Sequence, residues 1–210
     1  MSYNKYAFTL SNLGLKNTFK CMIRQLLSLN HYYILNRNLT SLPEGGKIRR
    51  KISVKKIDDQ DLTKIIQMVK LLDFKDKLEV LSRILFYDYG FKNCYVGKTK
   101  EGEIAYIQWL IYPYENKIIK NHFSNIFYPL RENQVMIENV FTFPGFRGLN
   151  LMPSITINLL NIAKENGYKS AVMYVKKDRI AALNENMRLG FKITKIITEY
   201  KFMLRIKRTL

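Results

Sequence analysis

The pattern of hydrophobic positions changes period within residues 134–163, which divides this stretch into a strand and a helix. β-Forming side chains dominate residues 135–141, and Glu138 and Asn139 interrupt the run where a bend or bulge fits. Pro144 and Gly145 end the extended part, because proline donates no backbone hydrogen bond and both residues favour turns. Helical spacing then begins, with apolar positions at Leu151, Ile155, Ile157, Leu159, Leu160 and Ile162.

Similar patterns predict further strands and helices on both sides of this stretch. The expected strands are 52–57, 94–98, 104–112, 169–175, 193–197 and 202–206, and the expected helices are 58–72, 78–85 and 180–187. The strands at 94–98 and 104–112 are expected to pair as a hairpin. Residues 113–129 are polar and aromatic, so they form either a wandering loop or a binding insertion. Their histidine, His122, suits a catalytic base by pKa, but we favour a solvent or packing role.

The first 51 residues are strongly basic and contain an amphipathic helical pattern. Its apolar positions are Leu15, Phe19, Met22, Ile23, Leu26 and Leu27, and its basic face carries Lys16, Lys20 and Arg24. Such a helix either lies on an anionic membrane surface or packs against the main domain or a second subunit, as in a homodimer. Pro43 to Gly46 then break the chain. We therefore expect a basic helical N-terminal extension at 1–48 and a main domain at 49–210.

Composition bounds the class of protein. A chain of 210 residues with 47% apolar content suits one globular domain with an appendage. Cys21 and Cys94 lie far apart without C-x-x-C spacing, so neither a structural disulfide nor a metal site is expected. The first residues lack the apolar run of a signal peptide, and the sequence therefore predicts a cytoplasmic protein, with peripheral membrane contact left open.

Net charge is the unusual bulk property, at +18 from 35 Lys and Arg against 17 Asp and Glu. One interpretation is attraction to phosphate-rich partners, such as a cofactor, a nucleic acid or an anionic membrane. The other is a basic but merely soluble surface. The lysines are scattered along the chain rather than clustered, which favours the second interpretation and makes nucleic acid an unlikely partner.

A candidate anion site lies between the strand and the helix of residues 134–163. The loop carries Arg147 and Gly148, and the helix that follows offers N–H groups without intrahelical partners. This loop resembles the acyl-CoA-binding motif of the GNAT N-acetyltransferase superfamily. Arg147 and Gly148 match the motif, whereas Asn150 and Met152 stand where the family has glycine or another small residue.

A second segment, residues 178–191, resembles the family's next conserved motif. Ala182, Gly190 and Phe191 match, while Arg179 replaces an asparagine and Asn186 replaces a tyrosine. The resemblance implies an α/β (α+β) fold with a mixed, mostly antiparallel twisted sheet flanked by helices. It also implies a V-shaped splay between two central parallel strands, here residues 137–142 and 171–175.

The resemblance implies acetyl-CoA as the co-substrate and assigns roles along the two motifs. The residues expected to bind it are Val140, Phe141, Thr142, Arg147, Gly148, Leu149, Asn150, Leu151, Met152, Arg179 and Asn186. Main-chain groups at Val140 and Thr142 would bind the pantetheine arm and the acetyl carbonyl oxygen. Glu138 is the candidate general base, although pairing with a lysine is an alternative role. Tyr174 or a water molecule would assist the departing thiolate, because Asn186 has no proton to release near neutral pH.

Two functions from different classes follow. The first is an acetyl-CoA-dependent N-acetyltransferase in which an amine acceptor attacks the thioester directly in a ternary complex. The basic composition would suit an acidic or phosphate-bearing acceptor, such as an amino sugar derivative. The alternative is a catalytically degenerate, GNAT-like basic protein that contacts nucleic acid or an anionic membrane surface.

Overall fold

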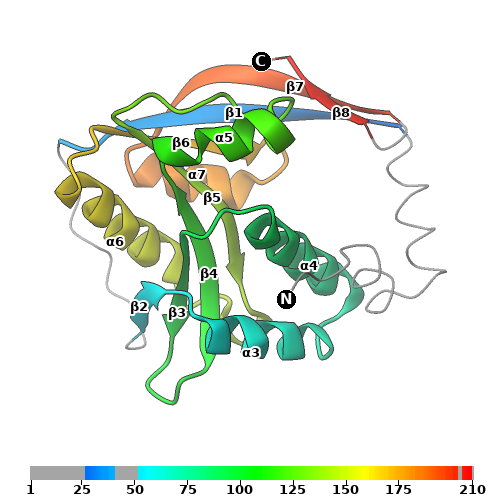
Figure 1. The fold of residues 1–210 in the computed structure, drawn as a ribbon, viewed down its shortest axis with the longest axis vertical. Helices are drawn as coiled ribbons and strands as arrows, with labels where there is room; N and C mark the ends of the chain where they lie inside the picture. The colour runs from blue at the N-terminus through cyan, green and yellow to red at the C-terminus, as the bar shows by residue number, and fades with distance from the viewer. Residues whose placement is uncertain (1–26, 41–51, 203–204, 210) are drawn as a thin grey trace.

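The strands of the described residues form one eight-stranded sheet, in the order β2-β3-β4-β5-β6-β1-β7-β8 (Figure 1). This computed structural model describes residues 27–40, 52–202 and 205–209. The strands are β1 Leu27–Asn38, β2 Ser53–Lys56, β3 Cys94–Lys98, β4 Ile104–Ile111, β5 Gln134–Thr142, β6 Ser170–Lys176, β7 Lys192–Phe202 and β8 Arg205–Arg208. All neighbouring pairs are antiparallel except β5 and β6, which are parallel. The mostly antiparallel sheet with two central parallel strands is therefore confirmed.

Four helices cover the two faces of the sheet: α3 Asp59–Val69, α4 Phe74–Asp88, α6 Leu151–Glu165 and α7 Ile180–Arg188. Helices α3 and α4 pack on one face, and α6 and α7 pack on the other, which gives two separate hydrophobic clusters. Figure 1 shows α4 and α6 on opposite sides of β4. Every side chain of β4 is buried, because this strand is covered on both faces.

Aspartates cap the first turns of α3 and α4. Asp58 accepts a hydrogen bond from the backbone N–H of Asp61, and Asp73 accepts one from that of Asp76. Each bond satisfies one of the N–H groups that lack an intrahelical partner in the first turn. The cap at Asp73 matters for the site, because it fixes the end of α4 from which Asp76 projects.

Residues 27–38 correct the prediction of a helical N-terminal extension. They form β1, which lies between β6 and β7 near the middle of the sheet. Ile34 and Leu35 are both buried, but they belong to the clusters on opposite faces, an arrangement that a strand produces and a helix does not. Pairing with two neighbouring strands makes this segment a strand, although the predicted helical pattern reaches as far as Leu27. The basic amphipathic pattern at residues 15–26 lies outside the described residues.

Two other expectations change in detail. The final strands were expected at 193–197 and 202–206, but β7 continues through Phe202 because it pairs with β1 along most of its length. Residues 113–123 are not a wandering loop, whereas a binding insertion stays a prediction. They form three short helical segments, η1 Pro113–Glu115, α5 Asn116–Ile118 and the π-helix η2 Ile119–Phe123. Ile119 and Phe127 anchor this region in the core beside α4.

Candidate active site

The two parallel strands β5 and β6 separate after three residue pairs. Gln134, Val135 and Met136 pair with Ser170, Ala171 and Val172, while the strands continue to Thr142 and Lys176. The predicted V-shaped splay is therefore present, although it starts at 173 on β6 rather than at 171. Separation leaves backbone N–H and C=O groups of both strands without ladder partners, so the gap offers hydrogen bonds to a bound ligand.

A cleft of about 820 Å³ follows this split. Its volume falls in the range typical of small-molecule sites, which is roughly 300–1,000 Å³. The predicted site residues that line it are Glu138, Val140, Phe141, Thr142, Arg147, Met152, Tyr174, Arg179 and Asn186. The other four, Gly148, Leu149, Asn150 and Leu151, lie in the loop and first turn that lead into α6, outside the lining. The structure thus brings most of the predicted site to one cavity.

A bulge interrupts β5 beside the split. The pairing with β4 passes from Phe141↔Ile107 to Glu138↔Trp109, so two residues of β5 lie opposite one residue of β4. Asn139 has φ 55°, a left-handed conformation that is uncommon outside glycine. The predicted bulge at Glu138 and Asn139 is therefore present, and it aims Glu138 into the cleft.

Glu138 is a shielded carboxyl group at this bulge. Its Oε2 accepts a hydrogen bond of 3.1 Å from the backbone N–H of Asn139. Its Oε1 is inaccessible to solvent and has no hydrogen-bond partner among the described residues. Burial raises the pKa of Glu138 to about 7, although Arg208 and Arg83 oppose the shift. A carboxyl group with this pKa exchanges protons near neutral pH, as a general base must.

Two more polar side chains face the cleft from the β6 side. The hydroxyl of Tyr174 accepts a hydrogen bond of 3.0 Å from the backbone N–H of Tyr128, and burial raises the pKa of Tyr174 to about 12. Tyr174 therefore keeps its proton at neutral pH and can donate it in a hydrogen bond. Asn186 donates to the carbonyl of Ala182, while its own Oδ1 is buried without a partner in the described part of the chain. His122 is exposed and does not line the cleft.

The loop before α6 has the backbone expected of an anion site. Gly148 has φ 76°, and a side chain added there would meet nothing within 4 Å, so the approach to its backbone is open. Asn150 takes the left-handed conformation at φ 55° and makes no side-chain cap. The first N–H groups of α6 are therefore left for a ligand. Met152 is half-buried and lines the cleft without closing it.

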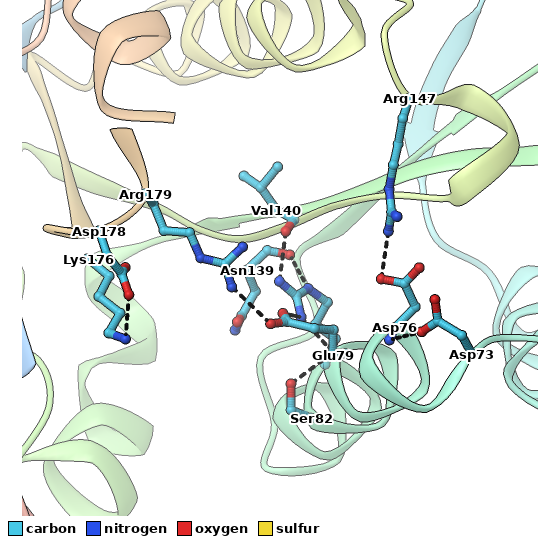
Figure 2. A network of polar contacts seen from close by, with 11 residues as sticks. Asp73, Asp76, Glu79, Ser82, Asn139, Val140, Arg147, Lys176, Asp178 and Arg179 are labelled. Atoms are coloured by element: carbon cyan, nitrogen blue, oxygen red, sulfur yellow. Dashed lines mark hydrogen bonds and ion pairs between the residues drawn. The ribbon is translucent and has the colours of Figure 1, made fainter. Parts of the chain in front are cut away.

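Acidic residues of α4 hold the two predicted phosphate-binding arginines (Figure 2). Arg147 pairs with Asp76 at 2.6 Å, and Arg179 pairs with Glu79 at 3.2 Å. The two carboxylates lie about one helical turn apart, and they reach arginines on opposite flanks of the cleft. Neither acid was among the predicted site residues. Their i, i+3 spacing, which places both on one helix face, was the available signal.

A buried ion pair of β7 and β8 contributes its arginine to the lining of the cleft. Arg208 of β8 pairs with Glu199 of β7 at 2.8 Å, and both side chains are almost fully buried. The guanidinium lies 3.9 Å from the centre of the Tyr32 ring and 5.7 Å from the ring centres of Phe127 and Tyr174. This group was not predictable from the sequence, because its members come from four distant segments of the chain.

Within the described residues, no group of three or more His, Cys, Asp or Glu side chains is arranged to hold a metal ion. None of the helices in that part of the chain is long and apolar enough to cross a membrane. Among the described residues the basic side chains lining the cleft are Lys75, Arg83, Arg147, Lys176, Arg179 and Arg208, and the acidic ones are Asp73, Asp76, Glu79 and Glu138. The cleft therefore favours an anionic ligand.

Neither a protein-family model nor a curated protein matches the chain. Among solved structures it is similar to a GCN5-related glucosamine N-acetyltransferase region in a fungal multi-domain GH3 β-N-acetylglucosaminidase, with a TM-score of 0.62 at 13% identity. That match covers 92% of this chain and 22% of the other. A GCN5-related N-acetyltransferase from Sphaerobacter thermophilus matches with a TM-score of 0.58 at 11% identity, over 92% of this chain and 56% of that one.

A GNAT-family acetyltransferase from Colwellia psychrerythraea also matches, with a TM-score of 0.58 at 11% identity. Here the alignment covers 94% of this chain and 72% of the other. The chain spans less than two thirds of the length of the first two structures. At these identities the likeness is one of fold, and the resemblance seen in two short motifs is confirmed at that level.

Proposed function

Because the chain has the fold of GNAT N-acetyltransferases, we propose that it transfers an acetyl group from acetyl-CoA to an amine. The observation that carries this proposal is the position of Glu138 at the point where β5 and β6 separate. A buried carboxyl group costs free energy in the folded state, so its presence at an open backbone edge favours a catalytic role.

The residues of the cleft fit acetyl-CoA from one end to the other. The N–H groups at the start of α6, together with Arg147 and Arg179, would hold the phosphates. The unpaired edge of β5 at Val140–Thr142 would bind the pantetheine amides. The uncapped helix end and the open approach at Gly148 are the features that make room for the diphosphate.

The proposed reaction is direct attack of the amine nitrogen on the thioester carbonyl carbon. Most amines are protonated at neutral pH, so Glu138 first takes a proton from the ammonium group, and the freed lone pair then forms the C–N bond. The nitrogen releases a second proton to solvent as the intermediate collapses to the amide. The C–S bond then breaks and the thiolate leaves. Because the pKa of Tyr174 lies above that of an ordinary thiol, its hydroxyl stabilises the thiolate by a hydrogen bond and solvent supplies the proton.

The acceptor would bind beside Tyr32, Phe127 and Arg208, which line the cleft together. Aromatic rings and a guanidinium suit a small amine that also bears an anionic or hydrogen-bond-accepting group. An amino sugar derivative is one such molecule. The excess of basic residues in the lining supports this class of acceptor.

The test combines binding with turnover. Acetyl-CoA should raise the melting temperature, because a ligand that binds only the native state stabilises it by mass action. A panel of amines should then be screened for thiol release from acetyl-CoA. A protein that ignores acetyl-CoA, but binds nucleic acid with a steep salt dependence, would instead be the degenerate basic binding protein.

A further inference from the structure

Arg83 of α4 binds the bulge of β5 from outside the strand. Its Nε donates to the carbonyl of Asn139 at 3.0 Å, and its Nη2 donates to the carbonyl of Val140 at 2.7 Å. The side chain is 8% exposed and lines the cleft. Figure 2 shows both carbonyl-bearing residues directly beside Glu79 of the same helix. One guanidinium therefore holds two consecutive peptide carbonyls.

Glu79 secures the other side of Arg83. The carboxylate lies 2.7 Å from Nη1 of Arg83, which also donates to the main-chain carbonyl of Glu79. A guanidinium this deeply buried needs a partner to offset its lost hydration. Glu79 supplies that charge and fixes the arginine in one orientation, so the contact with the bulge is rigid.

The bulge needs such support, because its backbone is strained and lies outside the ladder. Asn139 has a positive φ, and the register between β5 and β4 skips Asn139 and Val140. A non-glycine residue in the left-handed region costs free energy, and surrounding contacts must hold it there. Two charge-assisted hydrogen bonds from Arg83 are contacts of sufficient strength.

The contact also changes the two peptide groups electronically. In a trans peptide the carbonyl of Asn139 and the N–H of Val140 belong to one planar unit and point in opposite directions. A cation that binds the carbonyl polarises the unit, so the N–H becomes a stronger donor. The carbonyl of Val140 and the N–H of Phe141 are related in the same way. Arg83 thus acts on the peptide group of Val140, the residue expected to bind the acetyl carbonyl oxygen.

We propose that Arg83 is a positioning residue that fixes the bulge of β5 and strengthens the Val140 N–H as the donor to the acetyl carbonyl oxygen. The inference rests on the proposed function. It predicts that Arg83 acts on the transition state, where negative charge develops on that oxygen, more than on the binding of acetyl-CoA.

The experiment compares Arg83→Lys and Arg83→Gln with the wild-type protein. Lysine keeps the charge but loses the two-point contact, and glutamine keeps one donor without burying a charge. Both variants should lower kcat about 10- to 100-fold while the KM for acetyl-CoA changes by less than about threefold. The matched control is Arg188→Lys, an exposed arginine of α7 paired with Glu185, and it should retain full activity.

Two further readouts separate this role from a purely structural one. The infrared band of a 13C-labelled acetyl carbonyl should shift to lower frequency on binding the wild-type protein, and the shift should shrink in both variants. In Arg83→Gln the inflection of the pH–rate profile should also shift to higher pH, because the positive charge that lowers the pKa of Glu138 is lost. Arg83→Lys should leave the profile in place.

The outcomes are distinct. Wild-type protein that neither binds nor turns over acetyl-CoA would overturn the proposed function. Turnover in the wild type with normal kcat in a folded Arg83→Gln protein would overturn the role of Arg83 alone. If Arg83→Lys fails to fold, kcat and the carbonyl band of Arg83→Gln test the proposal, because the glutamine side chain places no charge at the buried position. An unchanged carbonyl shift in that variant also rejects the proposal.

Discussion

Arginines paired with carboxylates lie both at the inner end of the cleft and at its mouth, but those at the inner end are buried and those at the mouth are exposed. At the inner end, Arg83 and Arg208 are almost fully buried and each is held by a glutamate. At the mouth, the side chains of Arg147 and Arg179 are 50% and 59% exposed, and they pair with Asp76 and Glu79 of α4. Exposed ion pairs contribute about 0–1 kcal/mol, whereas breaking a buried pair costs several.

This difference in burial suggests that the two kinds of arginine have different roles. Buried arginines stay with one partner and so fix the geometry of the bulge and the acceptor end. The guanidinium of Arg147 is half exposed, so it can contact a phosphate when a ligand arrives, while Asp76, which is only 7% exposed, stays beside it. Changes at the inner end should therefore alter the chemical step, and changes at the mouth should alter affinity and its dependence on salt.

The largest effect is expected at Glu138. Glu138→Gln keeps the shape of the side chain but removes its ability to take a proton, and kcat should fall about 100- to 1,000-fold. The affinity for acetyl-CoA, measured by calorimetry, should stay within about twofold. Glu103→Gln, at an exposed position outside the cleft, is the control and should behave as the wild type. Full activity in Glu138→Gln would reject the base assignment.

The second-largest expected effect is the dependence of kcat/KM on pH. Burial raises the pKa of Glu138 to about 7, so the carboxylate form dominates only above that pH. The value of kcat/KM should therefore fall about tenfold per unit below pH 7 and level off above it. Glu138→Gln should lose this inflection in its residual activity. An inflection that persists unchanged in that variant belongs to another group.

A substitution of Arg147 tests whether the exposed arginines at the mouth of the cleft bind the phosphates of acetyl-CoA. Arg147→Gln should weaken acetyl-CoA binding about 10-fold at low salt, because one charge-assisted contact to phosphate is lost. The loss should shrink at high salt and should be absent for acetyl-pantetheine, which has no diphosphate. Arg188→Gln serves as the control, since this exposed arginine of α7 lies outside the cleft. Equal affinity of the Arg147 variant and the wild type for acetyl-CoA would remove the phosphate role.

Asp76 should give the smallest effect and one of opposite sign. Asp76→Asn frees Arg147 from its carboxylate partner, so acetyl-CoA should bind about threefold more tightly at low salt. The gain should vanish at high ionic strength. Asp59→Asn in the first turn of α3 is the matched control. Weaker binding in Asp76→Asn would mean that Asp76 orients Arg147 rather than competing for it.

Local sequence predicted the parts of the site that are continuous in the chain. The strand, turn and helix of residues 134–163 follow from periodicity and turn chemistry, and they carry the bulge, the phosphate loop and the split. The bulge at Glu138 and Asn139 was visible because two polar residues interrupt a β-forming run. Each of these features depends on neighbours within a few positions.

Features that depend on distant pairing were not predictable in this way. Residues 27–38 were assigned to a helix, and only pairing with β6 and β7 makes them a strand. Arg83 reaches carbonyls 56 and 57 positions further along the chain. A charged residue within an amphipathic helix pattern indicates an exposed face, and nothing local says that this one is buried against a bulge.

The most direct test is the structure of the protein in complex with acetyl-CoA or a non-transferable analogue. The diphosphate should lie on the first N–H groups of α6, and the pantetheine arm should run along Val140–Thr142 between the separated strands. The carbonyl oxygen should lie within hydrogen-bond distance of the Val140 N–H, with Glu138 facing the acceptor side. A ligand bound anywhere else, or a cleft that remains empty at saturating concentration, would contradict the account.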